Sequence, residues 1–296
     1  MKRFSPSEAA LEGFRLTRER PGTILVWGGV YFVGVMAMAV VLEIGLGPKF
    51  RLFLKSGGLG SSDVDAIADL LIQSWPAFLV ALLIAFVILA VITAGIYRLV
   101  LRPEEPGLAH LRFGPDEIRL AILNTLLFGM GFVFVALIEM ILQLLLSGQP
   151  QTSVLTALGL FLGACLMIWI GVRLSLATPM TFGQRRISIA EAWRLSRGHF
   201  WSLLGTIVLA LIFYLMIFLL ISIIGYSIVA ISGGEAAPSN PLHMSPVQLV
   251  ALAATLMIQL LLPILQIVTL YAPLAVAYQA LSGGEAEDAP GAVLPA

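Results

Sequence analysis

Four polar side chains within long apolar runs are the residues of this chain best placed for chemistry: Glu139, Gln143, Gln259 and Gln266. A carboxyl is costly inside an apolar run, so Glu139 is a functional candidate that can carry a proton or bind a cation. Gln143 follows it by one helical turn and can hydrogen-bond to it. Gln259 and Gln266, seven residues apart, share one helix face. Two interpretations stay open: hydrogen bonding between packed helices, and a polar path for a transported substrate.

A second set of candidates comes from a motif that occurs twice. Residues 12–18 (EGFRLTR) align with residues 191–197 (EAWRLSR), so the shared pattern is E-x-aromatic-R-L-[S/T]-R. Its arginines are Arg15, Arg18, Arg194 and Arg197. We expect each copy to form a short amphipathic helix in the headgroup layer, with guanidinium groups near anionic phosphates. Either the arginines anchor the chain without specificity, or they form a specific anionic-lipid site.

Six apolar runs must position these residues. A membrane-spanning helix needs about 20 mostly apolar residues, because the hydrocarbon core is roughly 30 Å thick. The chain is 59% hydrophobic and 11% charged, which excludes an ordinary soluble domain with about a quarter charged residues. The predicted spans are Thr23–Leu46, Pro76–Leu101, Ile118–Leu146, Thr152–Met180, Phe200–Ile231 and Val247–Ala280. The sequence therefore predicts an all-α integral membrane protein.

The basic residues predict the orientation of these spans. Fourteen of the 17 Lys and Arg residues precede the first span, or lie in or near the connections between spans two and three and between spans four and five. The other three, Lys49, Arg51 and Lys55, follow the first span. Since basic residues stay on the cytoplasmic side, both termini are expected in the cytoplasm.

Three parallel repeats are predicted, near residues 1–101, 112–180 and 185–281. Helix-start signals open the three units at Ser5–Glu8, Gly114–Glu117 and Ser188–Glu191, where a glutamate can bond the free backbone N–H groups. In the middle unit only Glu117–Leu120 survives of the repeated motif. Each unit is expected to be a cytoplasmic amphipathic helix followed by a transmembrane hairpin, all within one domain (residues 1–281). Residues 282–296 are expected to be a flexible tail.

The segments Arg173–Pro179 and Arg186–Trp201 resemble those of uncharacterised bacterial polytopic membrane proteins. These are related to the membrane domain attached to some bacterial glycerophosphodiester phosphodiesterases. Residues 94–104 (AGIYRLVLRPE) resemble a segment of proteobacterial members. The resemblance implies a bacterial inner-membrane protein without the catalytic barrel, whose activity is not carried over.

Motifs for catalysis and cofactor binding are missing from the sequence. The three histidines, His110, His199 and His243, are predicted on different sides of the membrane, and neither a phosphate-binding glycine loop nor a G-x-S-x-G motif occurs. The one cysteine, Cys165, is expected to be a buried small filler. We expect no cofactor, metal site, enzymatic activity or nucleic-acid partner. The expected partners are membrane lipids, another membrane protein or a second copy. The leading function is an accessory or scaffold protein, and the alternative is a transporter or lipid-handling protein.

Overall fold

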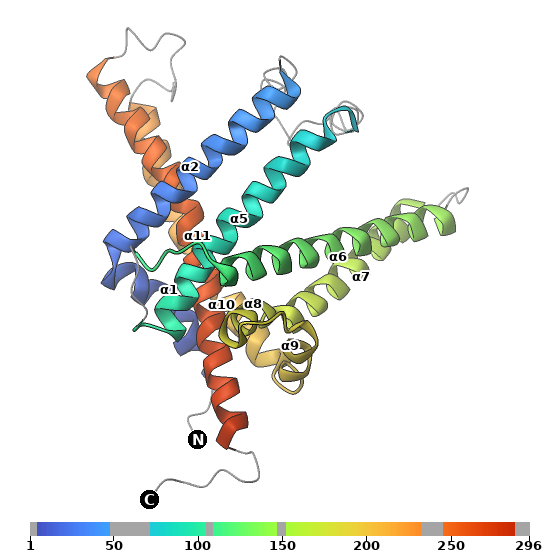
Figure 1. The fold of residues 1–296 in the computed structure, drawn as a ribbon. Coiled ribbons are helices and arrows are strands. Elements are labelled where there is room, and N and C mark those ends of the chain that lie inside the picture. Colours follow the sequence, from blue (N-terminus) through green and yellow to red (C-terminus); the bar gives the residue numbers. More distant parts are fainter. Residues whose placement is uncertain (1–4, 48–71, 105–108, 147–151, 232–244, 288–296) are drawn as a thin grey trace, which may run out of the picture.

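The computed structural model describes residues 5–47, 72–104, 109–146, 152–231 and 245–287 (Figure 1). These residues form the helices α1 (Pro6–Glu19), α2 (Pro21–Leu46), α5 (Trp75–Leu101), α6 (Pro115–Leu146), α7 (Thr152–Leu174), α8 (Ala177–Gln184), α9 (Ile189–Leu195), α10 (Phe200–Ile231) and α11 (Pro246–Glu287). The all-α class is therefore confirmed for the described part of the chain.

Six helical segments are long and apolar enough to cross a membrane, as the sequence predicts, which makes this a multi-pass membrane protein. Two boundaries differ from the predicted ones. The fourth predicted span breaks after Leu174, and the chain resumes as α8. The last helix continues to Glu287, past the predicted start of the tail at residue 282, while residues 288–296 lie outside the described part. Pro263 and Pro273 lie inside α11 without ending it.

The long helices pack in pairs that diverge from a common base. Helix α2 packs against α5, α6 against α7, and α10 against α11, and the three pairs spread apart away from the base (Figure 1). The base carries Arg98, Arg102, Arg119, Arg173 and Arg194 and is called the arginine-rich end below. Helix α5 is central, because it also contacts α6 and α11.

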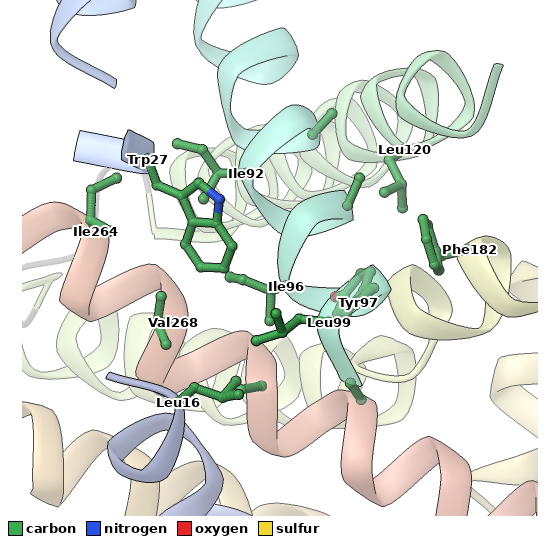
Figure 2. Close-up of a cluster of buried hydrophobic side chains, with 14 of the residues drawn as sticks. Leu16, Trp27, Ile92, Ile96, Tyr97, Leu99, Leu120, Phe182, Ile264 and Val268 are labelled. Carbon is green, nitrogen blue, oxygen red and sulfur yellow. The ribbon is translucent and has the colours of Figure 1, made fainter. Parts of the chain in front are cut away.

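The larger hydrophobic core lies between α2, α5 and α11, near the arginine-rich end (Figure 2). Trp27 of α2 lies between Ile92 and Ile96 of α5 on one side and Ile264 and Val268 of α11 on the other, and all five are fully buried. The Trp27 Nε1 group donates a hydrogen bond to a backbone carbonyl of the α5–α6 connection, which satisfies its polar atom.

The pair α6 and α7, called the α6–α7 arm below, buries far less of its surface against the rest of the protein than α2 and α5 do. In the most apolar 18-residue window of each helix, no residue is buried inside the protein. Within the arm the helices approach closely at Gly159 and Gly163, whose missing side chains leave room for Leu142 and Ile138. The outer part of the arm is therefore not covered by the other described helices, as expected of a surface that faces lipid.

The two short helices that carry the repeated motif dock on neighbouring long helices. In α1, an added Cβ at Gly13 would lie 2.7 Å from the Thr269 Cα of α11, and Phe14 packs edge-on against Phe213 of α10. In α9, Trp193 packs edge-on against Trp169 of α7. Both helices are held by tertiary contacts as well as by any contact with headgroups.

The middle copy of the motif corrects one expectation. Residues Glu117–Leu120 lie in the first turns of α6, not on a separate amphipathic helix. The first and third copies end before a break, at Arg20 with Pro21 and at Gly198 with a φ of +83°. No glycine or proline occurs between Glu117 and Phe128, so the middle copy continues directly into the apolar part of α6.

The predicted capping bond forms in the copy with the weakest signal. The Glu117 Oε2 atom accepts a hydrogen bond of 2.9 Å from the Gly114 backbone N–H, as a capping glutamate should. Ser5 and Ser188 make no side-chain cap bond to their helices, and the Ser188 hydroxyl instead donates to Gln184.

Candidate functional site

The arginine-rich end holds two guanidinium groups that serve the fold. Arg98 pairs with Glu117 and donates to the His110 carbonyl at 2.6 Å. Arg102 donates to the Phe182 and Gly183 carbonyls at 3.0 and 3.1 Å and lies 4.8 Å from the centre of the Phe182 ring. These contacts tie α5, α6 and α8 together, so both arginines are already engaged within the protein.

Two other arginines line a groove. Arg194 and Arg197 are exposed, and no ion pair or hydrogen bond from either side chain to another described residue is found. The nearby carboxylate of Glu191 pairs instead with Arg186, at 2.7 Å. The groove has a volume of about 680 Å³ and its lining consists of Met130, Ile170, Leu174, Ile189, Ala190, Trp193, Arg194 and Arg197. We call it the arginine groove; two cations face an otherwise apolar surface there.

A third arginine lies behind the wall of this groove. The Arg173 guanidinium lies 5.5 Å from the ring centre of Trp169 and 5.6 Å from that of Trp193. Its Nε and Nη1 atoms are buried and have no hydrogen-bond partner in the described part of the chain. A cation between two aromatic rings gains roughly 0.5–2 kcal/mol from each favourable contact, which keeps its charge beside Trp193. The region therefore carries three positive charges, and no carboxylate of the described residues is bound to them.

A second cavity adjoins the arginine groove. It measures about 540 Å³, lies between α5, α6, α7, α8, α10 and α11, and shares Met130, Ile170 and Leu174 with the groove as a common wall. Its lining is mostly apolar, with polar side chains at Asn124, Ser175, Thr178 and Tyr271. We call it the Asn124 cavity. Both volumes fall in the range of roughly 300–1,000 Å³ typical of small-molecule sites.

The four polar residues predicted inside the spans do not gather. The Gln143 amide donates to Glu139 Oε1 at 3.4 Å, so this predicted pair is formed, but both side chains are exposed on the α6–α7 arm. Gln259 and Gln266 are exposed on α11, which diverges from the arm (Figure 1). Neither the arginine groove nor the Asn124 cavity includes any of the four. A polar path through them stays a prediction.

The arginines of the first motif copy differ from those of the third. Arg15 is 2.8 Å from Glu12 and 3.9 Å from Glu19, so its charge is balanced on α1 itself. Arg18 is exposed. Neither lines a cavity described above. Of the four arginines predicted as lipid contacts, the structure brings only Arg194 and Arg197 together with an apolar groove.

Sequence reasoning did not select Arg173 or Asn124 as site residues. Arg173 counted only as one more basic residue of a connection, and Asn124 as an amide between helices. The sequence does contain one indication of the contact between Arg173 and Trp169, because Trp169 lies one helical turn before Arg173. The second ring, Trp193, comes from another helix, and that contact is set by tertiary packing.

The described residues contain no group of three or more His, Cys, Asp or Glu side chains able to hold a metal ion. Cys165 is exposed on α7, which corrects its predicted role as a buried filler. The likeness to membrane domains of phosphodiesterases stays a prediction. No protein-family model matches this chain, and no curated protein and no solved structure matches it.

Proposed function

We propose that this protein is a non-enzymatic, lipid-handling protein of the bacterial cytoplasmic membrane that binds an anionic lipid in the arginine groove. One observation supports this most strongly: Arg194 and Arg197 carry no partner among the described residues and line the same groove as apolar Ile170 and Leu174. An anionic headgroup joined to apolar chains complements both surfaces.

The charge of the groove favours a phosphate-bearing headgroup. Each Lys or Arg near an anionic membrane surface contributes about 1 kcal/mol of attraction. Arginine also offers a planar fork of donors that binds phosphate oxygens in pairs. Arg173 adds a positive charge behind Trp193, so an anion in the groove meets the field of three guanidinium groups.

The proposal includes the orientation of the protein in the membrane and its three internal repeats. The arginine-rich end faces the cytoplasm, with both termini on that side, because basic residues remain there. The docking of the three motif copies supports three parallel units. Helix α1 contacts α10 and α11, α9 contacts α7, and Glu117 of the middle copy pairs with Arg98 of α5. Each copy therefore contacts a helix pair other than the one it begins, as units arranged around a common centre would.

The test is the lipid that remains bound to purified protein. The protein is extracted in a mild detergent and its lipids are measured by mass spectrometry, for wild type and for Arg194→Ala with Arg197→Ala. We expect the double variant to retain on the order of tenfold less anionic lipid, since two contacts of about 1 kcal/mol each are removed. Unchanged anionic lipid in the double variant would refute the groove as the site.

Arg15→Ala with Arg18→Ala is the matched control, because these residues hold the same places in the motif but line neither cavity. It should leave the bound lipid near the wild-type level. An equal loss in both double variants would mean that basic residues attract anionic lipid without a specific site. The same purification tests the accessory role, since a scaffold protein should bring down a stoichiometric protein partner.

A further inference from the structure

The lining of the Asn124 cavity includes a buried amide without a hydrogen-bond partner in the described part of the chain. Asn124 is 8% exposed, and its Nδ2 atom is buried without a hydrogen-bond partner among the described residues. Two of the hydroxyls in the lining are engaged: Ser175 donates to the Val172 carbonyl at 2.8 Å, and Thr178 shares a 2.6 Å hydrogen bond with Tyr97. Besides the Tyr271 hydroxyl, the buried amide of Asn124 is therefore a donor that the cavity offers to an occupant.

An unsatisfied buried donor is costly, by about 1–3 kcal/mol, and buried polar groups in proteins are nearly always paired. The cavity is mostly apolar, with Phe86, Phe128 and Phe134 in its lining, which favours hydrocarbon over water. Water is held well only where it meets two to four polar partners. The occupant that fits is a hydrocarbon chain carrying one hydrogen-bond acceptor.

The position of the cavity identifies where such a chain would come from. The cavity shares the wall formed by Met130, Ile170 and Leu174 with the arginine groove. Methionine is unbranched and flexible, so Met130 can move aside to join the two spaces. A lipid with its phosphate at Arg194 and Arg197 would then extend a chain into the cavity. In a glycerolipid, the acceptors below the phosphate are the ester carbonyls that begin each acyl chain.

We propose that the Asn124 cavity takes one acyl chain of an anionic glycerolipid and that the Asn124 Nδ2 group donates a hydrogen bond to its ester carbonyl. This inference rests on the proposed function, since it assigns the headgroup of the same lipid to the arginine groove. It adds that the site distinguishes ester-linked chains from chains linked without a carbonyl.

The experiment compares four synthetic lipids on delipidated wild-type protein by native mass spectrometry. Two are phosphatidylglycerols and two are phosphatidylcholines, and each headgroup is used with ester-linked and with ether-linked chains of equal length. We expect wild type to bind the ester phosphatidylglycerol about threefold to tenfold better than its ether analogue, the effect of one hydrogen bond. Equal binding of ester and ether lipids would overturn the inference and leave water as the partner of Asn124.

Asn124→Leu, which replaces the amide by an apolar group of similar size, should lose the preference for ester chains and keep the preference for phosphatidylglycerol. Thr125→Val is the matched control on the same helix, because the Thr125 hydroxyl already donates to the Ala121 carbonyl and lines neither cavity. It should keep both preferences. An ester preference that persists in Asn124→Leu would overturn the inference.

The two headgroups separate this inference from the proposed function. Equal binding of phosphatidylglycerol and phosphatidylcholine, with the ester preference retained, would refute the arginine groove and support Asn124. A preference for phosphatidylglycerol without an ester preference would support the arginine groove and refute the role of Asn124. If Asn124→Leu does not fold, the comparison of ester-linked and ether-linked lipids on wild-type protein still tests the inference.

Discussion

Arg98 of α5 and Glu117 of α6 form an ion pair whose side chains are only 3% and 2% exposed. Glu117 also accepts the Gly114 N–H at the start of α6, and Arg98 donates to the His110 carbonyl of the preceding connection. One pair of side chains thus fixes the end of α5, the start of α6 and the connection between them. The α6–α7 arm is joined to the central helix through this point, through the neighbouring Arg102, and through an edge-on contact between Phe86 and Phe128.

Breaking this pair should cost more than replacing it. We expect Arg98→Met alone to lower the free energy of unfolding by about 3–5 kcal/mol, because it leaves the buried Glu117 carboxylate unpaired. The double variant with Glu117→Leu should recover much of that loss. Titration with a denaturing detergent measures both. Arg119→Ala, which breaks the more exposed pair with Asp116, is the control and should cost about 1 kcal/mol or less.

The close approach of α1 to α11 predicts a strong effect from a small substitution. Gly13→Ala would place a Cβ 2.7 Å from the backbone Cα of Thr269, so α1 must move away. We expect a loss of about 1–3 kcal/mol in the free energy of unfolding. Gly29→Ala is the control, since an added Cβ there meets nothing within 4 Å, and it should be neutral or slightly stabilising. Equal effects at the two glycines would contradict the docking of α1.

The hydrogen bond between Tyr97 and Thr178 should couple α5 to α8. Their hydroxyl oxygens are 2.6 Å apart in a buried site. In a double-mutant cycle of Tyr97→Phe and Thr178→Val, we expect a coupling energy of about 1 kcal/mol in thermal or detergent unfolding. Additive effects of the two substitutions would show that the bond does not stabilise the fold.

The exposed position of Cys165 predicts tolerance of a larger side chain. Cys165→Leu should change the free energy of unfolding by no more than about 0.5 kcal/mol, because the side chain is exposed on α7. Leu123→Ala on the facing helix of the arm should cost about 2–5 kcal/mol, since Leu123 is fully buried in the smaller core. A large loss from Cys165→Leu would mean that another helix or another molecule covers this surface.

Much of the fold could be predicted, because its strongest signals are local. Length and hydropathy locate the long helices, since a span is defined by its own sequence. The break after Leu174 was not predicted, because Ser175 and Leu176 do not interrupt the apolar pattern. The break depends on tertiary contacts: Leu176 is fully buried, and Thr178 is bonded to Tyr97.

The site was predictable only in part. The motif identified Arg194 and Arg197, but it gave the same weight to Arg15, and only the structure shows that Glu12 pairs with Arg15 while Glu191 is drawn to Arg186. Glu139 was selected because a carboxyl is conspicuous in an apolar run. Asn124 is less conspicuous in sequence, and its importance comes from a cavity formed by six helices.

The α6–α7 arm behaves mechanically as a beam fixed at one end. Its base is held by a buried ion pair and hydrogen bonds, and in the most apolar 18-residue windows of its two helices no residue is buried within the described part of the protein. A helix pair of this kind adapts to bilayer thickness by tilting, at a modest cost for each ångström of mismatch. Tilting of the arm moves α6 and α7 relative to α5, and these helices form walls of the Asn124 cavity. We therefore expect the thickness of the surrounding bilayer to set the width of that cavity.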